Sequence, residues 1–273
     1  MKFASFRPVI VLAALLFAFS ACSEEERAGA SAEVGEDTLL ADASAQDSSL
    51  LRSLRLDLLR TAFRNLDAYA FTRHVQTEQL DDTGDITARE SLAIRYQFRD
   101  GSRVSAVETL QTTGNFDYGA FGSFHTETST ASFSALADAF IPEEPPYLSP
   151  RSWDSFTYRI RPDTLIHGIR VGVFEIRAVP EATEQPAKHI VLYYDPASHA
   201  VIALHQELAQ PFLVFRESTS LYVQARPGPD GQWLPDTTSV STRIHLPLTE
   251  TRYFRTMSRF ADYSRVTPLS GGA

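Results

Sequence analysis

The sequence predicts a mainly β protein in which an antiparallel sheet follows one amphipathic N-terminal helix. From residue 67 onward, apolar and polar side chains alternate at period two, which is typical of half-buried strands. Short turn sequences separate the alternating runs, among them "DDTGD", "RDG", "DPASH" and "PGPDG". Because strands joined by short turns pair in opposite directions, we expect a meander of about ten strands in a single domain, residues 50–273.

Residues 50–66, "LLRSLRLDLLRTAFRNL", predict the helix. Their apolar side chains form one stripe at helical spacing, opposite the arginines: Leu51, Leu54, Leu58, Ala62 and Leu66. Ser48 or Ser49 is suited to cap the start of this helix. We expect the stripe to pack on the sheet, because strands follow directly. A helix lying on a membrane surface is the alternative.

The predicted strands follow in the order 68–80, 92–98, 153–160, 170–179, 189–195, 200–208, 212–225, 233–246 and 250–266. Residues 112–152 interrupt this meander with an irregular stretch, a short predicted helix at 132–140 and a Pro-rich loop. The runs 189–195 and 200–208 are apolar on both faces, so they need cover on both sides. Helices with an apolar ligand, or simply a packed core, would supply it.

The first residues predict export. Lys2 and Arg7 begin a short basic region, and an apolar run then ends at small residues before Cys22. Residues 1–21 therefore fit a secretory signal peptide, with a retained membrane anchor as the alternative. Cys22 is the chain's single cysteine, so it forms no internal disulfide.

Ser20-Ala21-Cys22 resembles the end of the lipobox of bacterial lipoproteins, although Phe19 stands where that motif prefers leucine. The resemblance implies that Cys22 becomes the first mature residue and carries acyl chains that hold the protein on a membrane. Residues 22–49 lack aromatics and are rich in acids, which predicts a lipidated flexible tether.

Charge and the segment after Cys22 restrict partners and location. Without Lys2 and Arg7 the chain keeps 23 basic and 34 acidic side chains, a net charge of −11, which argues against a nucleic-acid partner. Ser23 lacks the acid associated with inner-membrane retention, and the following "EEE" resembles surface-export signals of Bacteroidetes-type lipoproteins. We expect an outer-membrane location, on either the periplasmic or the outer side.

Three segments follow the predicted N-terminal helix in the order "IVLYYDPASHAVIALHQEL", "GQWLPDTTSVSTRI" and "TRYFRTMSRFADYSRV". This order resembles the outer-membrane lipoprotein-sorting family, LolA and LolB, and the resemblance covers residues 50–266. It implies a curved antiparallel sheet, an incomplete β-barrel whose apolar concave face is closed by helices and takes up acyl chains. The lipid expected at Cys22 places the chain nearer the anchored acceptor than the soluble carrier.

Four aromatic residues form the candidate ligand-binding lid. Phe116, Tyr118, Phe121 and Phe124 lie among three glycines in the segment 114–124, and a flexible aromatic segment can close over an apolar cavity. Ordinary core packing of the same rings is the alternative.

The sequence offers little for metal binding or catalysis. His205 and Glu207 share one strand face, and His189 or His199 could join them, but compact zinc-binding spacings are absent, so no metal or other cofactor is expected. There is no Gly-x-Ser-x-Gly motif, and Glu143 and Glu144 read as solvated loop acids. We expect a non-enzymatic lipoprotein that binds an acyl chain or a lipidated partner. A protein-interaction module without a lipid ligand is the alternative, and the oligomeric state is open.

Overall fold

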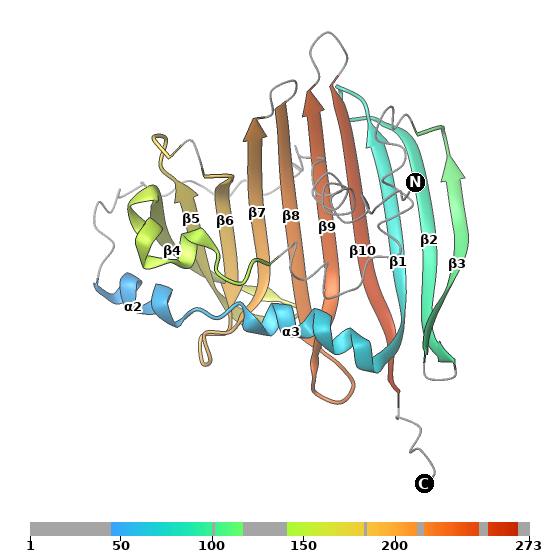
Figure 1. The fold of residues 1–273 in the computed structure, drawn as a ribbon, viewed down its shortest axis with the longest axis horizontal. Coiled ribbons are helices and arrows are strands. Elements are labelled where there is room, and N and C mark those ends of the chain that lie inside the picture. Colours follow the sequence, from blue (N-terminus) through green and yellow to red (C-terminus); the bar gives the residue numbers. More distant parts are fainter. Residues whose placement is uncertain are drawn as a thin grey trace, which may run out of the picture.

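The computed structural model describes residues 45–99, 102–116, 141–182, 185–211, 216–245 and 251–266. In these ranges the chain forms one ten-stranded sheet with helices lying across it (Figure 1). The strands are β1 (Tyr69–Leu80), β2 (Ile86–Arg99), β3 (Ser102–Thr113), β4 (Phe156–Ile166), β5 (Ile169–Ala178), β6 (Ala187–Tyr194), β7 (Val201–Pro211), β8 (Arg216–Pro227), β9 (Trp233–His245) and β10 (Arg252–Arg265). The helices are α2 (Ala45–Ser53) and α3 (Asp57–Asn65), with 3-10 helices η1 (Leu66–Ala68), η3 (Pro146–Leu148) and η4 (Pro150–Ser155).

The sheet is open and joins two meanders. Its strand order is β3-β2-β1-β10-β9-β8-β7-β6-β5-β4, and every neighbouring pair is antiparallel. The strands β1–β3 form one meander and β4–β10 the other. The first and last strands of the chain, β1 and β10, pair in the middle of the sheet. The predicted fold class, an antiparallel β sheet with an N-terminal helix, is confirmed.

The register defines two faces, because residues paired across strands point to the same side. We call the side that packs against α3 the helix face. One row of paired residues crosses the described sheet on this face: Ile160, Phe174, Leu192, Leu204, Val223, Thr238, Ser258, Val75, Leu92 and Thr109.

The predicted helix 50–66 is two helices. α2 begins at Ala45, within the segment 22–49 predicted as a tether, and α3 ends at Asn65. Between them the chain extends, and Arg55 forms a parallel bridge with Ala200 at the start of β7. The Arg55 amide donates to the His199 carbonyl at 3.1 Å and the Val201 amide donates to the Arg55 carbonyl at 2.8 Å, which offsets the lost helical hydrogen bonds.

The break changes which leucines are buried. Leu56 and Leu59 are buried, whereas Leu58, which the continuous stripe placed on the buried side, is only half-buried. A straight helix could not direct Leu54 and Leu56 into the same core, since residues two apart point in different directions.

The sequence runs identify all strands except β3. Almost every side chain of β3 is exposed, so it lacks the alternation that marks a half-buried strand. Among the described strands it lies at the edge of the sheet and pairs with β2 alone. β3 continues to Thr113 and η3 and η4 follow residue 141, so part of the predicted irregular stretch 112–152 is regular. The helix predicted at 132–140 lies outside the described residues.

Both predicted hairpins form. "DPASH" connects β6 to β7, and "PGPDG" connects β8 to β9. In the first, the His199 amide donates to the Asp195 carbonyl at 2.8 Å, and His199 has a positive φ of 57°. In the second, the Gly228 amide donates to the Gln232 carbonyl at 2.7 Å. The sheet order therefore follows the chain order from β4 to β10.

The predicted two-sided burial of β7 is also present. Val201 and Leu204 belong to the main core, while Ile202 and Ala203 are buried outside it. The sheet is strongly curved in this region: His167, in the β4–β5 turn, lies 2.9 Å from the Asp236 carboxylate of β9, although three strands separate β5 from β9.

None of the helices in the described ranges combines the length and apolar content needed to span a bilayer.

Phe63 on α3 provides a stability test. Its side chain is 1% exposed and its ring packs edge-on against Phe260 of β10 at 6.3 Å between centroids. We expect Phe63→Ala to lower the free energy of unfolding by about 3–5 kcal/mol, because it leaves a cavity between α3 and the sheet.

Urea unfolding of the full chain measures this effect, with Leu165→Ala as control. Leu165 is 67% exposed, so its truncation should change stability by at most about 0.5 kcal/mol. Equal stabilities of the two variants would contradict the packing of α3.

Candidate functional site

The helix face is apolar on one half and rich in hydroxyls on the other. In the row of paired residues that crosses the helix face, the members on β4–β8 are apolar. The β9–β10–β1 part carries buried hydroxyl side chains: Thr77, Thr238, Thr242 and Ser258. The Thr77 and Thr256 hydroxyls lie 3.3 Å apart, and among the described residues the Thr242 hydroxyl has no hydrogen-bond partner. This half of the helix face is therefore more polar than the β4–β8 half.

The helices cover part of this face. α3 crosses β7, β8 and β9, and α2 contacts β4 (Figure 1). Leu59, Ala62 and Phe63 of α3 are fully or almost fully buried against the sheet. These side chains fix α3 over the centre of the core, and its other side faces the segment 141–155.

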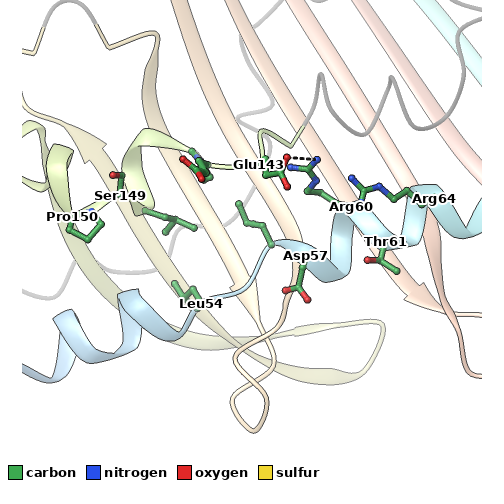
Figure 2. A pocket seen from close by; sticks show the side chains of 12 residues that line it. Leu54, Asp57, Arg60, Thr61, Arg64, Glu143, Ser149 and Pro150 are labelled. Atoms are coloured by element: carbon green, nitrogen blue, oxygen red, sulfur yellow. Dashed lines mark ion pairs between the residues drawn. The ribbon is translucent and has the colours of Figure 1, made fainter.

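A pocket of about 520 Å³ lies between α3 and residues 143–150 (Figure 2). We call it the α3 pocket. Its apolar residues are Leu54, Leu56, Pro145, Leu148 and Pro150, and its polar residues are Asp57, Arg60, Thr61, Arg64, Glu143, Glu144 and Ser149. Its size is within the usual range for small-molecule sites, roughly 300–1,000 Å³.

Charged side chains lie on both walls of the α3 pocket, with two arginines on α3 and two glutamates on the facing segment. Arg60 and Arg64 are one helical turn apart, and the Arg60 guanidinium lies 3.7 Å from the Glu143 carboxylate (Figure 2). Arg60 is buried whereas the Glu143 side chain is 83% exposed, so solvent screens this ion pair. The pocket therefore has leucine and proline walls with charged groups of both signs.

A buried tyrosine anchors the wall opposite α3 in the core. Tyr147, in η3, is 1% exposed and packs edge-on against Phe156 at 6.5 Å. Its buried hydroxyl, like the Trp153 indole N–H of η4, has no hydrogen-bond partner among the described residues. Burial raises the pKa of Tyr147. Its carbonyl accepts a hydrogen bond from the Tyr158 hydroxyl at 3.2 Å.

Beyond α3, the helix face keeps accessible apolar surface on β1–β3. Val75 and Leu92 are half-buried, and Val107 is 58% exposed. Arg73 lies among them, on the same face, and pairs across strands with Ile94 and Phe260. The sequence carried a signal for this residue, since position 73 falls between Phe71 and Val75 on the apolar face of β1.

The opposite face carries a charged cluster around Glu175 of β5. This buried carboxylate accepts hydrogen bonds from Arg161 at 2.6 Å and Arg177 at 2.7 Å, and lies 2.9 Å from His189 Nε2. Burial alone would raise the pKa of Glu175, but these partners outweigh it and lower the pKa to about 2. The cluster joins β4, β5 and β6 and leaves Glu175 engaged in ion pairs.

The histidines considered for metal binding lie near this cluster. His189 lies between Glu175 and Glu207, 3.5 Å from the latter, while His205 Nε2 contacts the Ser220 hydroxyl at 2.8 Å. His199 sits apart in the β6–β7 turn. Within the part of the chain that the structure describes, no three His, Cys, Asp or Glu side chains are grouped to hold a metal ion.

One of the four predicted lid residues lies within the described part of the chain. Phe116 is half-buried at the end of the described segment after β3, and Tyr118, Phe121, Phe124 and Cys22 lie outside the described residues. Glu143 and Glu144, which the sequence places in a solvated loop, both line the α3 pocket. The sequence reasoning missed this pocket because it depends on the break between α2 and α3.

Comparison with known proteins gives likenesses in structure only. No family model matches the chain, and no curated protein matches it. A DUF1329 family protein from Desulfovibrio piger is 12% identical, with 78% of this chain and 92% of that chain covered and a TM-score of 0.28.

Two further solved structures are similar at the same level. One, from Vibrio parahaemolyticus, is described as an outer membrane lipoprotein-sorting protein domain: 12% identity, 78% and 91% coverage, TM-score 0.28. The other is a LolA superfamily protein from Nitrosomonas europaea: 9% identity, 77% and 94% coverage, TM-score 0.24. At these TM-scores the likenesses carry no argument about what this chain binds.

The Glu175 cluster predicts a pH dependence of stability. Since the folded-state pKa is lowered from 4.5 to about 2, the stabilisation is present above pH 4.5 and is lost as the pH falls toward 2. We expect the loss of unfolding free energy between pH 5.5 and 3 to be smaller in Glu175→Gln than in the wild type, by at most about 2 kcal/mol.

Urea unfolding at both pH values measures this difference. Glu108→Gln is the control, because the Arg95–Glu108 pair on β2 and β3 is more than half exposed. If the free energy of unfolding depends on pH equally in Glu175→Gln and the wild type, Glu175 is not an ionised, ion-paired carboxylate in the folded state.

Proposed function

We propose that the protein is an outer-membrane lipoprotein, acylated at Cys22, that binds an acyl chain or a lipidated partner on its helix face without chemical change. The observation that supports this most is the α3 pocket. Its leucine and proline walls offer apolar surface, and its arginines and glutamates can meet a polar head group. Affinity for an acyl chain would scale with the apolar area that it buries, at roughly 25 cal/mol per Å².

The lining of the α3 pocket also offers a route by which an acyl chain longer than the pocket enters the core. Leu54 and Leu56 line the pocket and belong to the main core, so the pocket wall is continuous with the helix face. The backbone hydrogen bonds of Leu148, Ser149 and Ser152 are made within the facing segment, so they persist when the segment moves as a unit. Movement of residues 143–150 away from α3 would widen the pocket toward the sheet.

A protein-interaction module is the second candidate, and β3 is the observation that favours it. This edge strand exposes Val104, Val107 and Leu110, and of its twelve residues only Arg103 and Glu108 are charged. Unprotected edges of this kind accept a further strand from another chain. Leu110→Lys should then weaken partner binding, while acyl-chain binding at the α3 pocket stays the same.

Acylation at Cys22 is directly testable. In a bacterium with a lipoprotein pathway, we expect the wild-type chain to incorporate an alkyne-labelled fatty acid and to sediment with the outer membrane. Cys22→Ser should lose both properties, because no acyl chain then anchors the protein. Label on the Cys22→Ser variant would contradict attachment at this residue.

Acyl-chain binding can be tested at the α3 pocket. Thr61 is exposed on α3 and lines the pocket, so Thr61→Trp should fill the pocket with little effect on the core. We expect it to weaken binding of a fluorescent fatty acid by the full Cys22→Ser chain at least about tenfold. Excluding about two methylene groups, each worth about 0.8 kcal/mol, is enough for the roughly 1.4 kcal/mol of a tenfold change.

Thr113→Trp is the matched control, because Thr113 is exposed on the opposite face of β3. Its affinity should equal that of the parent chain. Equal affinity in Thr61→Trp would place the ligand elsewhere, and absence of binding by the parent chain would overturn the acyl-binding function and favour the interaction module.

A further inference from the structure

Arg73 is a cation inside a largely apolar face, and none of the carboxylates that the structure describes is its partner. It points from β1 to the helix face, and its row contains Phe260 on one side and Ile94 and Val107 on the other. Its Nε and Nη2 donate to the Ser258 hydroxyl at 3.1 and 2.9 Å, and its side chain also hydrogen-bonds Tyr96. The guanidinium lies 5.8 Å from the centre of the Phe260 ring.

Other arginines with buried surroundings are compensated. On the helix face, Arg103 of β3 lies 3.0 Å from Asp67. On the opposite face, Arg89 and Arg255 both bind Glu78, at 2.7 and 2.6 Å. In the described part of the chain, no carboxylate lies within ion-pair distance of Arg73, whose partners are neutral hydroxyls and an aromatic ring.

The nearest acid on the same face of β2 does not reach it. Glu90 is paired with Thr77, two rows away from the row that contains Arg73 and Ile94. Two rows correspond to four residues along a strand, or roughly 13 Å. An arginine has five N–H donors and stays protonated at neutral pH, so hydroxyl partners leave its charge uncompensated.

Apolar surface that a ligand can reach adjoins this charge. Val75 and Leu92 are half-buried and form the next row, and the exposed Val107 ends the row of Arg73 itself. A cation beside accessible apolar side chains is the complement of an amphiphile with an anionic head. An unsubstituted hydrocarbon or a neutral lipid would supply no negative charge to the guanidinium.

We infer that Arg73 binds the anionic head group, a carboxylate or a phosphate, of an acyl ligand whose chain lies along Val75, Leu92 and Val107. This inference rests on the proposed acyl-binding function and places an anionic head group at a second site on the helix face, separate from the α3 pocket. Ser258 and Tyr96 orient the guanidinium, while Phe260 contacts both Arg73 and Phe63 of α3. The head-group site is thereby connected to the helical cover.

The test compares ligands with equal chains and different heads. Palmitate, palmitoyl lysophosphatidate and hexadecanol compete with the neutral dye N-phenylnaphthylamine for the full Cys22→Ser chain. We expect at least one anionic ligand to bind about 10–100-fold more tightly than hexadecanol, which is the range of a charge-assisted hydrogen bond. The ratio between palmitate and lysophosphatidate separates a carboxylate from a phosphate ligand.

Variants locate the effect. Arg73→Gln should remove the preference for anionic ligands and leave hexadecanol affinity unchanged. Arg73→Lys should keep most of the preference, because the positive charge remains. If the glutamine variant does not fold, the lysine variant still tests the role of the charge. Arg95→Gln, on the exposed opposite face of β2, is the matched control and should keep the full preference.

The outcomes are distinguishable. Equal affinity of the wild type for hexadecanol and both anions, or a preference that survives in Arg73→Gln, overturns the role of Arg73 while acyl binding stands. If none of the three ligands displaces the dye, the proposed function fails and this inference fails with it.

Discussion

The pairing of β1 with β10 is the constraint on which the rest of the structure depends. It joins residues about 180 positions apart, from Tyr69 opposite Arg265 to Leu80 opposite Tyr253. Without it, the three N-terminal and seven C-terminal strands would be separate sheets with unpaired edges. The buried Glu78 reinforces this junction, since it holds Arg255 of β10 and Arg89 of β2 together.

This junction also builds the features to which we assign function. Arg73 meets Ser258 and Phe260 only because β1 lies beside β10. α3 reaches the same place from the other side through Phe63, whose ring contacts Phe260. A single buried phenylalanine therefore links the helical cover, the centre of the sheet and the cation on the helix face. The α3 pocket lies on the far side of α3, so one helix separates two regions suited to an amphiphile.

The sequence predicted the strands that have one buried face and one solvent-exposed face. β2 shows this well, because Ile94 and Tyr96 are buried while Arg95 between them is exposed. β3 escaped prediction because both of its faces are exposed. The apolar residues of the helical segment were predicted, but the division into two helices was not. The bridge between Arg55 and Ala200 replaces helical hydrogen bonds at the break, and these residues are 145 positions apart. The pocket that this break creates was therefore not visible in the sequence.

The sequence by itself determined the antiparallel sheet, its hairpins, the apolar stripe ahead of it and the expectation of a lipid anchor at Cys22. These follow from local chemistry, because side-chain periodicity and turn residues act over a few positions. Only the tertiary structure decided that the helix is divided, that β1 pairs with β10 and that Arg73 has no carboxylate partner among the described residues. Each of these depends on pairing between distant strands, whose free energy comes from burial and hydrogen bonding that no single segment contains.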